Sequence, residues 1–68
     1  MKAVSGKEFC KLLKKKGWHL ARVQGSHHIY TKENEISRIS VPVHGSQVLK
    51  KGRQRHIMKL ADIMDSEL

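Results

Sequence analysis

The sequence predicts one α+β domain, in which a three-stranded antiparallel sheet carries two helices on one face in the order α-β-β-β-α. Three observations predict this fold class. Apolar residues recur at helical spacing near both ends of the chain. Three short β-prone stretches lie between them, separated by turn residues. A chain of 68 residues holds one domain, residues 1–68, and such a sheet buries its apolar side only if both helices pack against the same face.

The first helix is predicted over residues 6–16. Ser5 and Glu8 have the spacing of a capping box, in which Ser5 accepts a hydrogen bond from the Glu8 amide and Glu8 reaches back. Gly17 follows at the point where a helix commonly ends in the left-handed conformation. The apolar face between these two ends consists of Phe9, Leu12 and Leu13.

Three strands should follow, joined by short turns. Residues 24–26 and 33–35 contain the Gly, Ser and Asn that are typical of turns. Pro42 ends the third strand because it has no amide proton for the ladder. The strands are expected at residues 18–23, 27–32 and 36–41.

A second helix is predicted over residues 53–61, after Gly52, because apolar residues again recur at helical spacing. A ragged turn is expected over residues 62–68. This connectivity matches a double-stranded-RNA-binding-domain-like fold. The expected core consists of Phe9, Leu12, Leu13, Trp18, Ile39, Val41, Ile57 and Leu60.

Charge is the most informative property of the composition. Fourteen Lys and Arg residues stand against six Asp and Glu, which gives a formal net charge of +8. Such a density of cations attracts polyanions and binds phosphate backbones without regard to sequence. A solvated surface or an acidic protein partner would explain the charge as well. The unopposed cations form two clusters, Lys14, Lys15 and Lys16, and then Lys50, Lys51, Arg53, Arg55 and Lys59.

The composition also argues against several classes of protein. Cys10 is the only cysteine, so no internal disulfide can form, which fits a reducing cytosol. No Cys and His spacing typical of a zinc site is present, and we expect neither a metal nor another cofactor. No apolar run is long enough to cross a membrane or to act as a signal peptide, so a cytoplasmic protein is expected. A chain this short has a thin stability margin, which makes a stabilising protein partner plausible.

Histidine is well suited to RNA cleavage near neutral pH. RNA supplies its own nucleophile, the 2′-hydroxyl, so an enzyme has only to move protons and stabilise a pentacoordinate phosphate. His27 follows the Gly25-Ser26 turn at the start of a strand, where its ring can be held firmly and still meet solvent. Strand periodicity puts His27 and Ile29 on one face and His28 on the other, so the two histidines do not bind one metal merely by being adjacent. The alternative for His27 is a rim residue at the edge of the core.

Several short motifs together resemble the HicA family of bacterial toxins over nearly the whole chain. They are, in order, Ser5-Gly6-Lys7-Glu8, Lys16-Gly17-Trp18, Gly25-Ser26-His27-His28-Ile29-Tyr30, Val41-Pro42 followed by His44, and Leu49-Lys50-Lys51-Gly52 before a basic helix. Each motif is weak by itself, and their order and spacing make the resemblance specific. The chain departs from the family at Arg53, where a Thr usually follows the glycine.

The resemblance implies a ribonuclease that cleaves messenger RNA and is held inactive by a HicB antitoxin. The histidine of the family's Gly-Ser-His motif is the catalytic residue, and it corresponds to His27. Position 28 varies in the family, so His28 inherits no role. The candidate RNA-binding residues beside His27 are Ser26, Lys50, Lys51, Arg53 and Arg55, of which the last four cluster around a helix N-terminus, itself an anion site.

Other readings stay open at this point. The fold and charge would also serve a non-catalytic RNA-binding module, or an interaction protein whose basic face binds an acidic partner. In the ribonuclease, the second proton-transfer group is a neighbouring lysine, His44 or water. Tyr30 is either a core residue, which is the more frequent fate, or a platform on which a base stacks. His19 and His56 are expected to be surface or partly packed residues.

Overall fold

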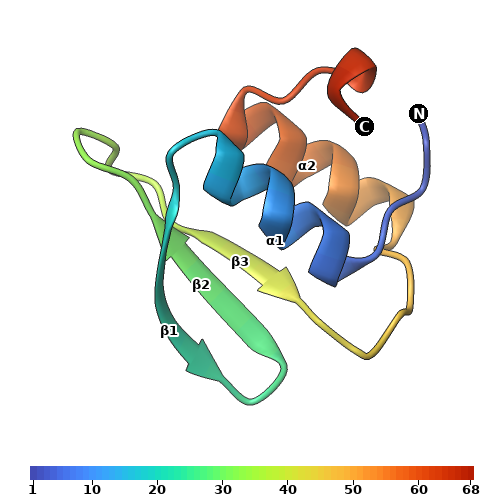
Figure 1. Cartoon of the computed structure of the whole chain (residues 1–68), viewed down its shortest axis with the longest axis horizontal. Helices are drawn as coiled ribbons and strands as arrows, with labels where there is room; N and C mark the ends of the chain where they lie inside the picture. The colour runs from blue at the N-terminus through green and yellow to red at the C-terminus, as the bar shows by residue number, and fades with distance from the viewer.

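The computed structural model describes residues 1–68 and shows the predicted order of elements (Figure 1). A helix is followed by three strands, a second helix and a short final 3₁₀ helix. The α-β-β-β-α architecture is therefore confirmed. The bounds are Gly6–Lys15 for α1, His19–Gln24 for β1, His27–Thr31 for β2, Ile39–Pro42 for β3, Lys51–Ala61 for α2 and Asp65–Glu67 for η1.

The sheet is antiparallel throughout, and β2 is its central strand. β1 and β2 form a hairpin closed by the turn Gly25-Ser26, in which Gly25 has a φ of 60°, a left-handed value that favours glycine. On its other side β2 pairs with β3, so that His27 lies opposite Pro42. The first residue of β2 therefore meets the last residue of β3, where the loop toward α2 begins.

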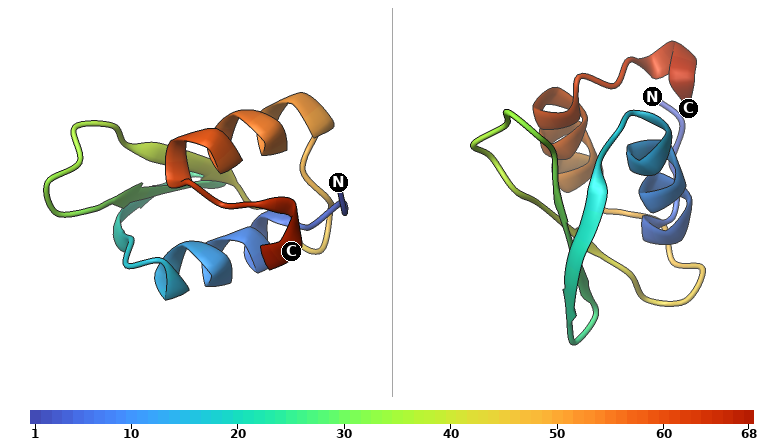
Figure 2. Two further views of the ribbon diagram at one scale, coloured as in Figure 1. Left: turned by 90° about the horizontal axis from the view of Figure 1, so that it is seen from above. Right: turned by 60° about the vertical axis from the view of Figure 1, so that its left-hand side comes forward.

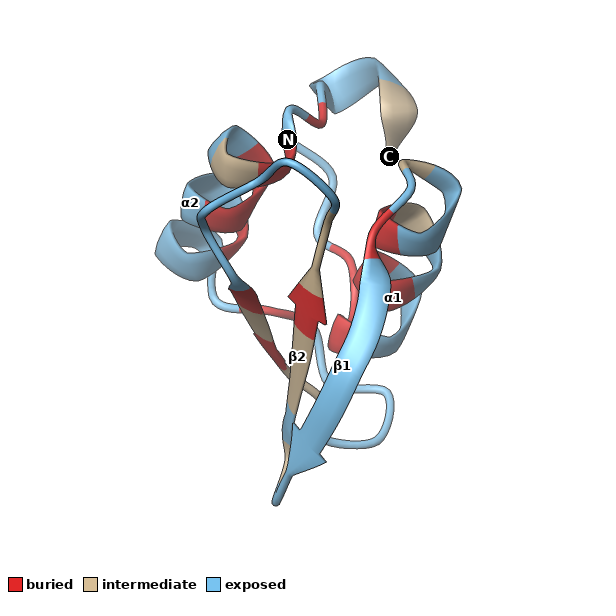
Figure 3. Ribbon diagram, turned by 90° about the vertical axis from the view of Figure 1, so that its left-hand side faces the viewer, coloured by how far each residue is buried: buried red, intermediate tan, exposed pale blue.

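Both helices lie on one face of the sheet, side by side and with their amino ends at the same side of the molecule (Figures 1 and 2). Tyr30, Ile39 and Val41 point to the helices and are buried. Alternation along β2 and β3 puts His27 and Ser40 on the opposite, open face. β1 is exposed along its whole length (Figure 3). Only 1% of Tyr30 is exposed, so of the two alternatives for this residue the structure shows the core position.

One hydrophobic core joins the helices to the sheet. Of the predicted core residues, Leu12 and Leu60 are only partly buried and pack against its outside. Gln54 of α2 is buried as well, and it donates to the Lys2 carbonyl at 2.7 Å and accepts from the Val4 amide at 3.3 Å. It thereby ties the amino-terminal segment to α2. The core consists of Val4, Phe9, Cys10, Leu13, Trp18, Tyr30, Ile39, Val41, Leu49, Ile57, Met58, Ala61 and Ile63.

The start of α1 is packed against the end of β3. The Ser5 hydroxyl accepts a hydrogen bond from the Glu8 amide at 3.1 Å, as predicted, and donates to the Glu8 carboxylate at 3.2 Å. Glu8 thus reaches back to the Ser5 hydroxyl and not to the backbone amide that a capping box would use. A Cβ atom at Gly6 would collide with the carbonyl oxygen of Pro42. Glycine at this position therefore lets the helix approach the strand closely.

Two element boundaries differ from the sequence prediction by more than one residue. β3 begins at Ile39, not at residue 36, and Ile36 is fully exposed. The strand was predicted to begin at Ile36 because β-branched residues favour strands. However, β2 ends at Thr31, so no residue of β2 remains to pair with Ile36. α2 begins at Lys51 and includes Gly52, because a glycine in the first turn does not prevent a helix from forming.

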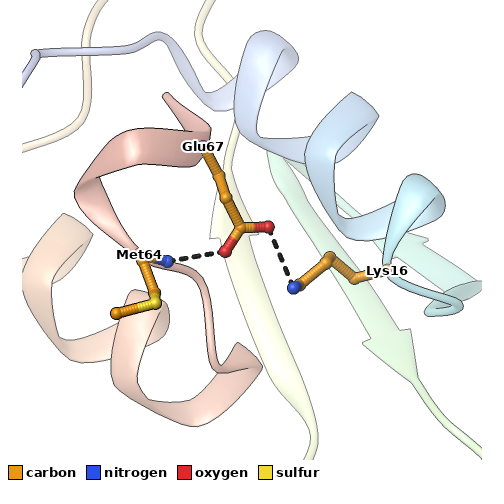
Figure 4. Close-up of polar contacts among 3 residues, drawn as sticks. All are labelled: Lys16, Met64 and Glu67. Atoms are coloured by element: carbon orange, nitrogen blue, oxygen red, sulfur yellow. Dashed lines mark hydrogen bonds and ion pairs between the residues drawn. The ribbon is translucent and has the colours of Figure 1, made fainter.

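The carboxyl-terminal turn expected from the sequence is η1, which is tied to α1. Glu67 accepts a hydrogen bond from the Met64 amide at 2.9 Å and pairs with the Lys16 ammonium at 2.9 Å (Figure 4). These interactions, the backbone hydrogen bond first, hold the pKa of Glu67 below its ordinary value. The two chain ends consequently lie near each other on the side of the helices (Figure 2).

Candidate active site

His27 is the first residue of β2 and stands on the open face of the sheet. Its side chain is exposed, and its Nδ1 atom lies 3.1 Å from the hydroxyl oxygen of Ser40 in β3. The two residues are diagonal neighbours on one face of adjacent strands, which is why this hydrogen bond can form. The bond orients the imidazole ring and leaves Nε2 free to meet a ligand.

A hollow of about 230 Å³ opens beside His27, and we call it the His27 pocket. Its other side chains come from the end of β3, from the loop after it and from the start of α2. The Val43 amide donates to the Ser26 carbonyl at 2.7 Å, and the Leu49 amide donates to the Val4 carbonyl at 2.9 Å, so both ends of this loop are fixed. The polar lining of the pocket consists of His27, His44, Gln47, Lys50 and Arg53.

The His27 pocket is electropositive. Lys50 and Arg53 line it, and no Asp or Glu does. Neither of these cations forms an ion pair, since the only ion pair of the molecule joins Lys16 to Glu67. An anion in the pocket would therefore meet two cations without displacing an acidic side chain.

The first turn of α2 adds to this positive character. Lys50 is the N-cap residue but makes no side-chain capping hydrogen bond, and no acidic residue lies in the first turn. The amides of Lys51, Gly52 and Arg53 have no acceptor within the helix. They carry the positive end of the helix dipole, and such a helix start binds phosphate groups well.

The structure separates the predicted RNA-binding residues. Lys50 and Arg53 line the His27 pocket. Lys51 is exposed in the first turn of α2. Arg55 lines a different hollow, near the chain ends, together with Asp62 and Asp65, so we leave it out of the RNA-binding surface. Ser26 stays in the turn that precedes His27.

Two polar residues of the site were not expected from the sequence. Ser40 is thirteen positions away from His27, so only the pairing of β2 with β3 reveals their contact. Gln47 comes from an irregular loop that no periodic pattern describes. His44, one of the candidates for the second proton-transfer group, lines the same pocket as His27. His28 lies opposite the core residue Val41 and does not line the pocket.

The remaining nucleophilic and acidic groups lie elsewhere. Cys10 and Tyr30 are buried together between sheet and helices, and burial raises the pKa of both, with their mutual hydrogen bond raising that of Tyr30 further. No three His, Cys, Asp or Glu side chains are grouped as a metal ion would require. Neither helix has the length and apolar character needed to cross a membrane.

The sequence model of one protein family, described as the HicA toxin of bacterial toxin-antitoxin, matches residues 6–63 of the 68-residue chain. The chain belongs to the HicA toxin family. The predicted resemblance is therefore confirmed, and it gives the chain the toxin role in a toxin–antitoxin system. No curated protein matches the chain in a direct sequence comparison. The HicA match covers α1, the whole sheet and α2, and so includes every residue that lines the His27 pocket.

Proposed function

We propose that this HicA toxin is a ribonuclease that cleaves messenger RNA, with His27 as its catalytic residue. One observation carries the proposal: the ring of His27 is held by Ser40 beside a pocket whose charged side chains are all cationic. An RNA phosphate in this pocket would meet a proton-transfer group and positive charge within one hollow. These are the two requirements for cleavage of a phosphodiester by a neighbouring 2′-hydroxyl.

The reaction uses the 2′-hydroxyl of the RNA as its nucleophile. One group removes the proton of this hydroxyl while its oxygen attacks the adjacent phosphorus. The bond from phosphorus to the 5′-oxygen then breaks as that oxygen receives a proton, leaving a 2′,3′-cyclic phosphate and a 5′-hydroxyl. Nε2 of His27 performs one of these transfers, because Nδ1 is engaged by Ser40. The chemistry requires no metal ion, in agreement with a pocket lining that contains no carboxylate.

We assign the other proton transfer to His44. This residue is exposed and lines the same pocket as His27, although it comes from the loop after β3. A histidine can accept or donate a proton near neutral pH, whereas a lysine, ordinarily protonated there, can only donate. Two histidines in one pocket can therefore perform both proton transfers of the reaction, one as the base and the other as the acid.

Lys50, Arg53 and the free amides of the first turn of α2 stabilise the transition state. Negative charge grows on the non-bridging phosphate oxygens as the pentacoordinate phosphorus forms. Fixed positive groups that point at this charge stabilise the transition state more strongly in a partly enclosed pocket than in open water. Lys50 and Arg53 are free for this role because neither forms an ion pair.

The partner that holds the toxin inactive in the cytoplasm is a HicB-type antitoxin. An acidic surface on the antitoxin would cover the His27 pocket and neutralise Lys50 and Arg53, so that blocked access and charge complementarity act together. An antitoxin that binds only the folded toxin also raises the apparent stability of the toxin by mass action. RNA and antitoxin should consequently compete for the same surface.

The test compares cleavage of an unstructured RNA by the wild-type protein and by a His27→Ala variant, with product ends determined by mass spectrometry. Loss of a positioned acid–base group typically lowers the rate by ~10²–10⁴. The fold should survive, because the His27 side chain is exposed, and circular dichroism checks this. The matched control is His19→Ala, an exposed histidine of β1 outside the pocket, which should keep wild-type activity.

In the same assay, His44→Ala should lower the rate and flatten one limb of the pH profile of kcat/KM, while the other limb remains. Activity should persist in EDTA. Full-speed cleavage by His27→Ala, or loss of wild-type activity in EDTA, would end this mechanism. A wild-type protein that binds RNA but never cuts it would favour the non-catalytic RNA-binding module.

A further inference from the structure

A second pocket adjoins the His27 pocket along the edge of β3. It lies between β3 and α2 and has a volume of about 740 Å³, within the range of ~300–1,000 Å³ that is typical of ligand sites. Arg38 comes just before β3, and Arg53 and His56 are three positions apart on α2, which puts them on one side of the helix. We call it the β3–α2 pocket, and its polar lining consists of Arg38, Ser40, Lys50, Arg53 and His56.

The charge of the β3–α2 pocket is not balanced by any acidic residue. No Asp or Glu lines it, and Arg38 forms no ion pair. The hollow on another side of α2 differs, because Arg55 and Lys59 share it with Asp62 and Asp65. The same helix therefore presents a purely cationic side toward His27 and a charge-balanced side away from it.

Three side chains connect the β3–α2 pocket to the His27 pocket. Lys50 and Arg53 line both hollows. Ser40 lines the β3–α2 pocket and contacts Nδ1 of His27 at 3.1 Å. A polyanion that occupies one pocket can therefore continue into the other along an unbroken set of cations.

We infer that the β3–α2 pocket binds the nucleotide next to the scissile phosphate of a single-stranded RNA, with Arg38 and His56 as substrate-binding residues. The inference rests on the proposed ribonuclease function for the identity of the ligand. A guanidinium binds phosphate oxygens in a two-pronged fashion, which suits Arg38 to the neighbouring phosphate. Ile57 and Leu60 give the pocket an apolar floor against which a base can lie, and a base is free to do so only when it is unpaired.

The first experiment measures binding without catalysis. A 2′-O-methylated RNA oligonucleotide lacks the nucleophile and stays intact, so fluorescence anisotropy can follow its affinity over a range of salt concentrations. Arg38→Ala should weaken binding about three- to tenfold and should reduce the log–log salt slope by ~0.7, the value for one phosphate contact to a single strand. The matched control is Arg55→Ala, the arginine of the charge-balanced side of α2, which should leave the affinity within about twofold of wild type.

The second experiment locates the contact relative to the cleaved bond. A dinucleoside monophosphate contains only the scissile phosphate, whereas a longer oligonucleotide adds the neighbouring one. Arg38→Ala should lower kcat/KM for the longer substrate and leave kcat/KM for the dinucleotide unchanged. His56→Ala, compared with His19→Ala, should show the same selectivity to a smaller extent.

Equal weakening of binding by Arg38→Ala and Arg55→Ala would show a delocalised attraction to net charge and would overturn the subsite. If Arg38→Ala bound RNA with unchanged affinity, the subsite would be overturned as well. The result would favour an acidic protein surface as the ligand of the β3–α2 pocket. If the binding pattern appears as expected while no RNA is cleaved by the wild-type protein, the subsite stands and the ribonuclease proposal fails.

Discussion

Helices α1 and α2 begin side by side, because the segments that lead into them pair through a bridge between Ser5 and Val48. α1 is closed at its start. The Ser5 side chain accepts from the Glu8 amide at 3.1 Å, Glu8 adds a negative charge to the first turn, and Gly6 lies directly against the backbone of Pro42. The polar groups and the backbone of this helix start are used inside the protein.

α2 is open at its start. Its N-cap residue Lys50 makes no side-chain hydrogen bond, its first turn has no acidic residue, and a Cβ atom at Gly52 would meet nothing within 4 Å. Free amides beside Lys50 and Arg53 cost helix stability, since cations are unfavourable at the positive end of the dipole. The start of a helix can thus serve either the fold or a ligand: the start of α1 stabilises the domain, and the start of α2 keeps its donors available for phosphate.

The largest effect is expected from closing the start of α2. Lys50→Asp puts a carboxylate where it can accept from the free amides of the first turn, so α2 should be stabilised by about 0.5–2 kcal/mol. The same carboxylate would repel a phosphate, and we expect RNA cleavage to fall by roughly 10²-fold or more. Thermal unfolding and RNA cleavage measured on one preparation check both effects.

Lys50→Ala is the control for this change, because it removes the cation without adding a cap. It should lower cleavage less than Lys50→Asp and leave the stability nearly unaltered. Full cleavage activity of Lys50→Asp would show that phosphate does not use the start of α2.

A smaller effect, of opposite sign in the two helices, is expected from adding one methyl group to each helix start. Gly6→Ala should destabilise the protein by about 1–3 kcal/mol, because the backbone of Pro42 has to move away. Gly52→Ala meets no neighbour within 4 Å and should stabilise α2 by about 0.5–1 kcal/mol. Denaturant unfolding of both variants and of wild type measures the two changes in the free energy of unfolding. If both variants were destabilised, or both stabilised, the two helix starts would not differ in the way described.

The smallest effect concerns the other end of α1, where Glu67 pairs with Lys16. The pKa of Glu67 is lowered in the folded state from its ordinary value of 4.5, so its contribution to stability is present above that value and is lost as the pH falls through the lowered folded-state pKa. Glu67→Gln should therefore be slightly less stable than wild type at pH 7 and equal to it in acid. A stability difference that persists at low pH would assign the effect to packing of the tail.

Much of the fold could be predicted from local patterns. Ser5 and Gly17 mark the ends of α1 because capping depends on residues only a few positions apart, and Gly17 does adopt a left-handed φ of 92°. The turn before His27 and the alternation of side chains along β2 are also local signals, and they put His27 and Tyr30 on opposite faces of the sheet. The predicted start of β3 at Ile36 was wrong, because this boundary depends on a partner that is distant in the sequence. A strand cannot extend past the end of the strand with which it pairs.

The order of elements and the charge of the surface could thus be predicted from the sequence, since both depend on residue type and short-range spacing. The resemblance to the HicA family singled out His27 as the candidate catalytic residue. Which residues surround His27 could be seen only in the folded protein. The contact of Ser40 with His27 requires the register of β2 against β3, and the gathering of Arg38 with Lys50 and Arg53 requires α2 to lie along the edge of β3. These neighbours are brought together by packing of the apolar faces into one core, a long-range process that the spacing of polar residues along the chain does not record.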